Sequence, residues 1–169
     1  IEAAHLREPP LDLTLRAPGE AQSWAERLGA EVLPTGSLRI AARGRVSGLP
    51  GFDEGAWWVQ DAAAAVPARM LGDVAGLRAL DLCAAPGGKT AQLASAGARV
   101  VAIEASKSRA ARLEANLARL RLEAQLVMAD ACQWRPETPF GHILLDAPCT
   151  ATGTIRRHPD LIHLKTPQD

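Results

Sequence analysis

The sequence has few cysteines, and no two of them are close together. Three occur in 169 residues, at positions 83, 132 and 149, without a Cys-x-x-Cys pair or a disulfide framework. This excludes a small secreted protein stabilised by disulfides and favours a reducing compartment. The four histidines do not have the spacing of zinc ligands, so we expect no metal site.

Long apolar runs and an excess of charge of one sign are also absent. No apolar run approaches the length of a membrane span and no signal peptide is visible, so we expect a cytoplasmic protein without membrane contact. The formal net charge is zero, which excludes a strongly basic nucleic-acid binder but allows local basic patches. The length suits one compact domain, or one domain plus a fragment of another, and we expect a monomer. Because the chain begins at Ile1 and ends on "LKTPQD", we expect a truncated polypeptide.

Residues 1–50 have the pattern of a small α+β segment. Leucines alternate with polar residues over residues 9–17, which predicts a half-buried strand. Helical spacing follows over 19–30, with Gly29 as the expected C-cap, and short strands broken by proline and glycine follow over 31–52. This segment is the expected remainder of a separate domain, and residues 53–71 are predicted to form a helix that contains Pro67.

From residue 51 to 169 the chain has the pattern of an α/β domain. Apolar strands are predicted at 77–82, 98–104, 124–130 and 141–148, with helices at 87–97 and 106–122. Such alternation predicts a parallel sheet covered by helices on both faces, as in a doubly wound Rossmann-like fold.

Small residues and acids stand at the ends of these predicted strands. The first strand runs into "DLCAAPGGKT", where Gly87 and Gly88 open a helix whose amino end favours an anionic group. The next strands end on Glu104, Asp130 and Asp146, and an acid such as Glu104 can accept hydrogen bonds from both hydroxyls of a ribose. Since ligands bind at the carboxyl ends of parallel strands, these residues predict one binding edge.

The same glycine-rich stretch allows a second interpretation, a P-loop that binds a nucleoside triphosphate. The stretch ends in Gly-Lys-Thr, and "HILLDAP" resembles a strand that ends on a magnesium-binding acid. However, the first glycine of the P-loop pattern would fall at Cys83, and Pro86 removes an N–H group that a phosphate cradle needs.

Two motifs together resemble those of a known family. "DLCAAPGGKT" and "DAPCTATGTIRRHPD" are similar to motifs of the Fmu/Sun family of RNA cytosine-5 methyltransferases, and "LPGFDEGAWWVQDAAA" is similar to the lead into its catalytic domain. The resemblance implies a Rossmann-like core dependent on S-adenosylmethionine, incomplete here at the C-terminus, and ribosomal RNA as the expected substrate. It also implies a cofactor-binding set of Cys83, Ala84, Ala85, Pro86, Gly87, Gly88, Lys89, Glu104, Asp130 and Asp146. In this set Glu104 would bind the ribose, Asp130 would lie near the adenine, and Asp146 near the methionine amino group or the target base.

The resemblance also gives Cys149 a catalytic role. In family members the thiolate of one cysteine, in a Thr-Cys-Ser motif, adds to carbon 6 of cytosine. Carbon 5 can then attack the methyl group of S-adenosylmethionine. A second cysteine, in a Pro-Cys motif, assists release of the product, and Cys149 matches this second cysteine. No residue matches the first, so we expect the nucleophile to lie beyond Asp169 and the chain alone to be inactive. The family pattern is "DAPCSGTG", and this sequence departs from it at Thr150 and Ala151.

Basic residues predict contact with RNA. Residues 1–50 are interpreted as part of an RNA-binding segment because Arg39, Arg43 and Arg45 lie in a stretch without acids. Arg156 and Arg157 are further candidates for phosphate contacts. The alternative to an enzyme is a non-catalytic module that binds RNA or the cofactor.

Overall fold

The computed structural model describes residues 9–41, 44–149, 154–155 and 160–164. The first half of the chain forms a four-stranded antiparallel sheet with one helix and two 3-10 turns. The strands pair in the order β2-β3-β1-β4. The elements, in chain order, are β1 (Leu11–Leu15), η1 (Pro18–Glu20), α2 (Ala21–Leu28), β2 (Glu31–Val32), β3 (Leu38–Ile40), η2 (Val46–Gly48) and β4 (Trp57–Val59).

The alternating pattern of β1 gives this sheet two different faces. Leu13 and Leu15 pack with Trp57 and with Trp24 of α2 in a core of their own. The helix ends where the sequence predicts, because Gly29 adopts the left-handed conformation with a φ of 60°. The other face of β1 carries the polar side chains of Asp12 and Thr14, both nearly fully buried.

The helix predicted over residues 53–71 is wrong. Residues 51–55 form a turn, Trp57–Val59 form β4, which pairs with β1, and only Val66–Arg69 are helical, as α3. Pro67 stands in the first turn of that short helix, the position that tolerates proline. The first sheet therefore continues past residue 50, where the sequence suggested a boundary between two parts of the chain.

The second half of the chain forms the predicted parallel sheet. Its strand order is β7-β6-β5-β8, and every described pairing is parallel. The elements are β5 (Arg78–Leu82), α4 (Gly88–Ser95), β6 (Arg99–Glu104), α5 (Lys107–Leu120), β7 (Gln125–Met128), β8 (His142–Leu145) and α6 (Leu161–Leu164). Each strand and helix of the predicted alternation is confirmed within a few residues.

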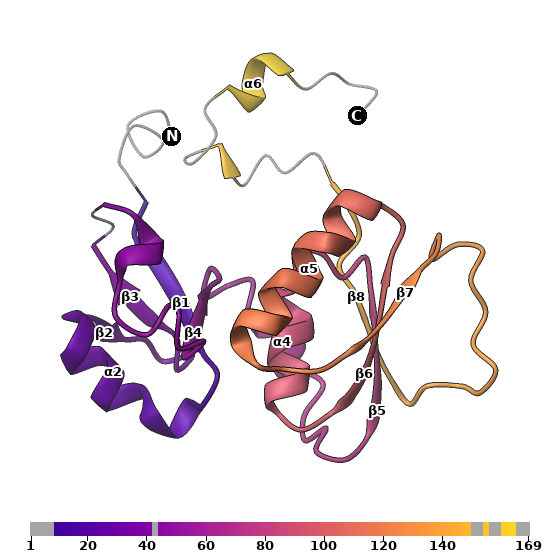
Figure 1. Ribbon diagram of the computed structural model, residues 1–169, viewed down its shortest axis with the longest axis horizontal. Coiled ribbons are helices and arrows are strands. Elements are labelled where there is room, and N and C mark those ends of the chain that lie inside the picture. Colours follow the sequence, from indigo (N-terminus) through magenta and orange to yellow (C-terminus); the bar gives the residue numbers. More distant parts are fainter. Residues whose placement is uncertain (1–8, 42–43, 150–153, 156–159, 165–169) are drawn as a thin grey trace.

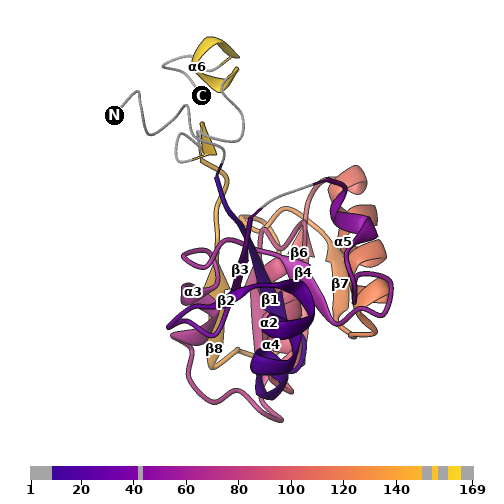
Figure 2. The same ribbon diagram turned by 90° about the vertical axis from the view of Figure 1, so that its left-hand side faces the viewer.

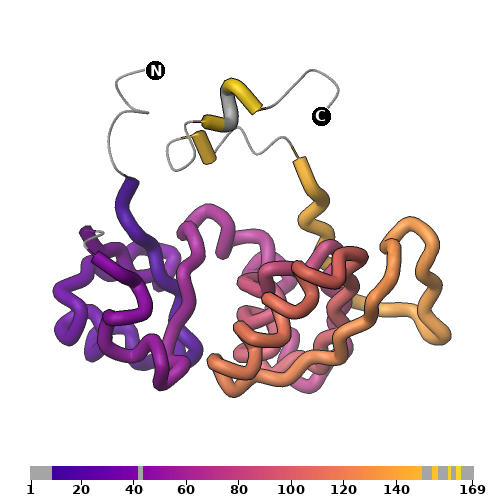
Figure 3. The backbone as a smooth tube through the Cα atoms, turned by 45° about the horizontal axis from the view of Figure 1, so that its top comes forward, coloured from indigo at the N-terminus to yellow at the C-terminus, as the bar shows by residue number. Residues whose placement is uncertain are grey.

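The two faces of the parallel sheet differ in what covers them. Both α4 and α5 lie on the face toward the first sheet, whereas the segment between β7 and β8 lies on the opposite side (Figures 1 and 3). Trp134 and Phe140 of that segment pack against Leu80, Val101 and Ile103. The prediction of helices on both faces is therefore wrong for the described residues, and Ile143 and Leu145 of β8 are left exposed.

Helix α4 lies between the two sheets, so the fold has three layers (Figures 1 and 2). Four consecutive residues of this helix, 90–93, are buried, as expected for a helix with neighbours on all sides. A buried glutamine pair joins the layers, because Gln60 Nε2, just after β4, donates to Gln92 Oε1 at 2.7 Å. Gln60 Oε1 in turn accepts a hydrogen bond of 2.9 Å from the Trp58 indole.

No helix among the described residues is long and apolar enough to cross a membrane.

The pairing of Arg39 with Asp12 leads to a prediction about stability. Asp12 is buried and receives two hydrogen bonds from the Arg39 guanidinium, at 2.7 and 2.8 Å, and a third from the Ala62 N–H at 3.0 Å. Arg39→Ala removes two charge-assisted hydrogen bonds from a buried carboxylate, so we expect a loss of about 2 kcal/mol in the free energy of unfolding. Urea unfolding measures this loss. Arg45→Ala, at a neighbouring exposed arginine, is the matched control, and an equal effect of both changes would contradict the prediction.

Candidate active site

The carboxyl ends of the parallel strands bring the predicted residues to one edge in a fixed spatial order. The strand order is β7-β6-β5-β8. Asp130 follows β7 and Glu104 ends β6. The 83–89 loop follows β5 and Asp146 follows β8. Neighbouring strands lie about 4.8 Å apart, so this row spans roughly 14 Å. Such a row suits an extended ligand that crosses the strand ends.

The 83–89 loop turns sharply from β5 into α4. Cys83 adopts a left-handed conformation with a φ of 61°, and the Ala84 N–H donates to the carbonyl of Ile103 at 3.0 Å. Gly87 also has a positive φ, of 103°, and a Cβ at this position would lie 2.4 Å from Leu113 Cδ1. Glycine is therefore required at residue 87 both by the backbone conformation and by the approach of α5.

A pocket of about 240 Å³ opens at this loop and gathers most of the predicted residues. Cys83, Ala84, Ala85, Pro86, Gly88, Lys89 and Asp146 line it. Gly87, Glu104 and Asp130 do not line this pocket, although Glu104 and Asp130 stand farther along the same edge.

Five residues that were not selected from the sequence also line the pocket. They are Val59, Gln60, Asp61, Ala64 and Asp81. The first four follow or end β4, so the first sheet contributes one wall of the pocket. The signal for them was present, since polar residues follow the apolar stretch "WWV", but that stretch was interpreted as part of a helix.

Three of the charged residues that line this pocket, Asp81, Lys89 and Asp146, lie close together. Lys89 Nζ lies 2.6 Å from Asp146 Oδ2, which ties the start of α4 to the end of β8. Asp81 is buried in β5 and accepts a hydrogen bond of 2.6 Å from the Thr90 hydroxyl. Burial raises the pKa of Asp81 from its ordinary value of 3.8 to about 6, although the Thr90 hydrogen bond and the Lys89 charge oppose this effect.

The Glu104 carboxylate is held at one of its two oxygens. Oε1 accepts from the Ser106 N–H at 2.8 Å and lies 2.8 Å from Arg109 Nη2. No described residue donates a hydrogen bond to Oε2, so this oxygen can accept one from a ligand. Asp130 is exposed, and its Oδ1 accepts from the Cys132 N–H at 2.8 Å, so its carboxylate also caps the following turn.

The three cysteines lie in different surroundings, and all are thiols. Cys83 is half-buried in the loop, and burial, followed by the nearby Glu104 charge, raises the pKa of its thiol, so it stays protonated at neutral pH. Cys149 and Cys132 are exposed. Cys149 follows β8 three residues after Asp146, at the same edge of the sheet.

The arginines predicted to contact RNA have different surroundings. Arg39 already forms the ion pair with Asp12, so its guanidinium has an internal role, although the side chain is 40% exposed. Arg45 is exposed at the start of η2. Arg43, Arg156 and Arg157 lie outside the described residues. Contact of any of these arginines with RNA stays a prediction.

Comparison with known proteins identifies the family. A family model described as 16S rRNA methyltransferase RsmB/F matches residues 68–169, which include every element that forms the edge. The chain belongs to this family. It is 52% identical over 122 residues to the ribosomal RNA small subunit methyltransferase B of Pseudomonas putida, an alignment that covers 69% of this chain and 28% of the relative. The chain spans less than half the length of this and other curated relatives.

Solved structures show that the whole arrangement recurs. The crystal structure of PH0851 superposes with a TM-score of 0.82 at 29% identity, over 95% of this chain and 40% of that chain. The structure of NSun6 from Pyrococcus horikoshii with SFG superposes with a TM-score of 0.58 at 32% identity, over 67% of this chain and 33% of that chain. Together with the parallel sheet, these likenesses confirm the Rossmann-like methyltransferase core.

The raised pKa of Asp81 predicts how stability depends on pH. Because the folded pKa lies above the unfolded one, the contribution of Asp81 is fully present below about pH 4 and is lost as pH rises through about 6. Asp81→Asn cannot ionise and still accepts from Thr90. Each pKa unit corresponds to about 1.4 kcal/mol, so above about pH 7 we expect the variant to be on the order of 2–3 kcal/mol more stable than the parent chain.

Urea unfolding at about pH 4 and about pH 8 tests this expectation. Asp73→Asn, at an exposed aspartate, is the control and should follow the pH profile of the parent chain. If Asp81→Asn also followed the parent profile, Asp81 would not be the group that titrates.

Proposed function

We propose that this chain forms the S-adenosylmethionine-binding part of an enzyme that methylates carbon 5 of cytosine in ribosomal RNA. The observation that carries the proposal is the row of Asp146, the 83–89 loop, Glu104 and Asp130 along one edge of a parallel sheet. Membership of the RsmB/F family supports both the reaction and the RNA substrate. We also propose a cytoplasmic location, where ribosomal RNA is available.

The residues at this edge fit the groups of S-adenosylmethionine. Glu104 Oε2 can accept from a ribose hydroxyl, and the loop from Cys83 to Gly88 has no long side chain that would keep a sulfonium centre away. Asp81 and Asp146 place negative charge where an amino acid ammonium group would lie. Asp130, at the end of the row, is the proposed neighbour of the adenine.

When bound, the cofactor supplies the electrophilic methyl group. The chain's own residues position the cofactor and the base. Cys149 follows Asp146 by three residues at the same edge of the sheet, in the Pro-Cys motif that assists product release in the family. Its proposed task is to act after methyl transfer, when the proton on carbon 5 leaves and the thiol on carbon 6 is expelled. The 169 residues contain no Thr-Cys-Ser motif, so the second candidate for this chain alone is a cofactor-binding module without transfer activity.

RNA is the proposed partner, through its phosphates. Arg45 is the described candidate, together with Arg43, Arg156 and Arg157 outside the described residues. The interpretation of residues 1–50 as an RNA-binding segment stays a proposal. Arg39 is a weaker candidate than the sequence suggests, because Asp12 already neutralises its charge.

Cofactor binding is tested by calorimetry on this chain. We expect S-adenosylmethionine and S-adenosylhomocysteine to bind, and ATP with Mg²⁺ not to bind. Glu104→Gln should weaken cofactor binding by about tenfold, since one charge-assisted hydrogen bond to the ribose is lost. Glu114→Gln, at an exposed acid of α5, is the matched control. Binding of ATP without binding of either adenosyl compound would sink the proposal and favour the P-loop interpretation.

The role of Cys149 is tested in a protein in which this chain is extended to the length of its curated relatives. Cys149→Ala should allow attack and methyl transfer but slow the release of RNA. We expect a covalent protein–RNA adduct that survives denaturing electrophoresis, and none with Cys132→Ala. Normal turnover of the Cys149→Ala protein without an adduct would show that Cys149 has no part in release.

A further inference from the structure

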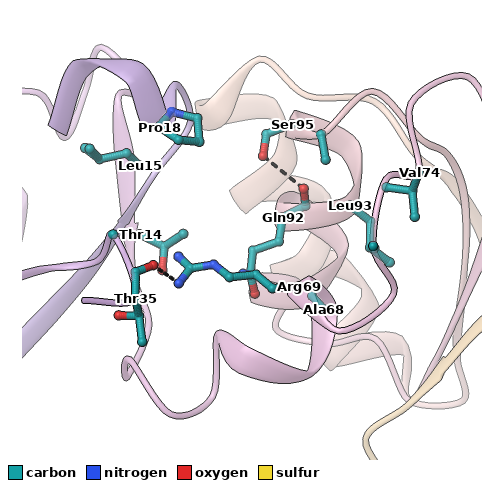
Figure 4. A pocket seen from close by; sticks show the side chains of 13 residues that line it. Thr14, Leu15, Pro18, Thr35, Ala68, Arg69, Val74, Gln92, Leu93 and Ser95 are labelled. Carbon is teal, nitrogen blue, oxygen red and sulfur yellow. Dashed lines mark hydrogen bonds between the residues drawn. The ribbon is translucent and has the colours of Figure 1, made fainter. Parts of the chain in front are cut away.

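A second pocket lies at the junction of the two halves of the chain, away from the strand edge. Its volume is about 300 Å³. β1 and the turn before β3 form one side, and α3, the turn after it and the last residues of α4 form the other (Figure 4). Gly88 opens α4 at the cofactor pocket and Ser95 ends it at this one. The hydrogen bond between Gln60, which lines the cofactor pocket, and Gln92, which lines this one, lies between the two pockets.

Two buried hydroxyl groups on its walls have no hydrogen-bond partner. Thr14 of β1 is only 4% exposed, and its Oγ1 is buried without a partner among the described residues. The Oγ1 of Thr35, in the turn before β3, is in the same state. An unpaired buried hydroxyl costs about 1–3 kcal/mol, so two of them on one pocket indicate that something else completes their hydrogen bonds.

A cation stands beside these hydroxyls. The Arg69 guanidinium donates to the carbonyl of Thr35, and the two residues lie together with Thr14 at one end of the pocket (Figure 4). Arg69 has no recorded ion pair with a described residue, and no residue that lines the pocket is acidic. The Arg69 side chain is exposed to solvent, and its partial burial lowers the pKa of the guanidinium.

The rest of the pocket gives the ligand an orientation. Leu15, Pro18, Val74 and Leu93 make its walls largely apolar. Ser95 lies at the end opposite Thr35, where α4 finishes (Figure 4). Arg69 is the one charged residue among the described residues that line the pocket, so an anionic group belongs at its end.

From these contacts we infer that the junction pocket binds a phosphate group, which accepts hydrogen bonds from Thr14, Thr35 and Arg69. A phosphate offers several oxygen acceptors to two hydroxyls and a guanidinium, and its charge balances Arg69. Any organic part attached to the phosphate extends along the apolar walls toward Ser95. This site is independent of the proposed cofactor site, because no residue lines both pockets.

The test is a titration of this chain with inorganic phosphate, followed by phosphorus NMR at constant ionic strength. Thr14→Val keeps the shape of the side chain and removes the hydroxyl, so we expect phosphate affinity to fall by about tenfold. The free variant should melt no lower than the parent chain, because an unpaired buried hydroxyl is removed. Arg69→Met should weaken binding at least as much.

Two matched controls separate the pocket from general effects. Ser37 also has a buried hydroxyl without a partner, but it does not line the pocket, so Ser37→Ala should leave phosphate binding unchanged. Arg112→Met, at an exposed arginine of α5, is the control for Arg69. Equal loss of affinity in Thr14→Val and Ser37→Ala would overturn the inference, as would a parent chain that does not bind phosphate.

The source of the phosphate is resolved by a second titration with a short single-stranded oligoribonucleotide. If the group belongs to RNA, Thr14→Val weakens oligonucleotide binding and inorganic phosphate competes with it. If the ligand is a free phosphate compound, only the phosphate titration responds to the variants. Both results support a phosphate site, and absence of any response in both titrations contradicts it.

Discussion

The buried hydrogen bond between Gln60 and Gln92 is the contact on which the arrangement of this molecule depends most. It joins the first sheet to α4 at a distance of 2.7 Å, between two largely buried side chains. The same helix is held from the other side by Thr90, which donates to Asp81 of the parallel sheet. Breaking either bond would leave a buried polar group unpaired, so the helix that begins at the cofactor loop has little freedom to shift.

This constraint explains why the pocket at the strand edge is built from both halves of the chain. Residues 59–64 form one wall because Gln60 fixes their position against α4, and the 83–89 loop forms the opposite wall because α4 begins there. The junction pocket has the same origin at the other end of the helix, where the two halves meet around Thr14 and Arg69. One buried helix thus separates two sites of different chemistry.

Local pattern was sufficient for the parallel sheet and for the row of strand-end acids along one of its edges, because apolar strands and strand-end acids are properties of short segments. It failed over residues 53–71, where alanine-rich sequence favours a helix but pairing of Trp57–Val59 with β1 decides the structure. It did not reveal the ion pair of Arg39 with Asp12, since this cross-strand partner lies 27 residues away in the sequence. Gln60 was missed because its segment was interpreted as part of a helix, and Asp81 because its burial beside Thr90 arises only in the folded chain.

A crystal structure of this chain with S-adenosylhomocysteine tests the account most directly. The account predicts a ligand laid across the strand ends, with its ribose at Glu104 and its amino acid end between Asp81 and Asp146. Residues 59–64 should contact it from the first sheet. A ligand that made no contact with Glu104, or that occupied the junction pocket beside Arg69 instead, would contradict the assignment of the strand edge as the cofactor site.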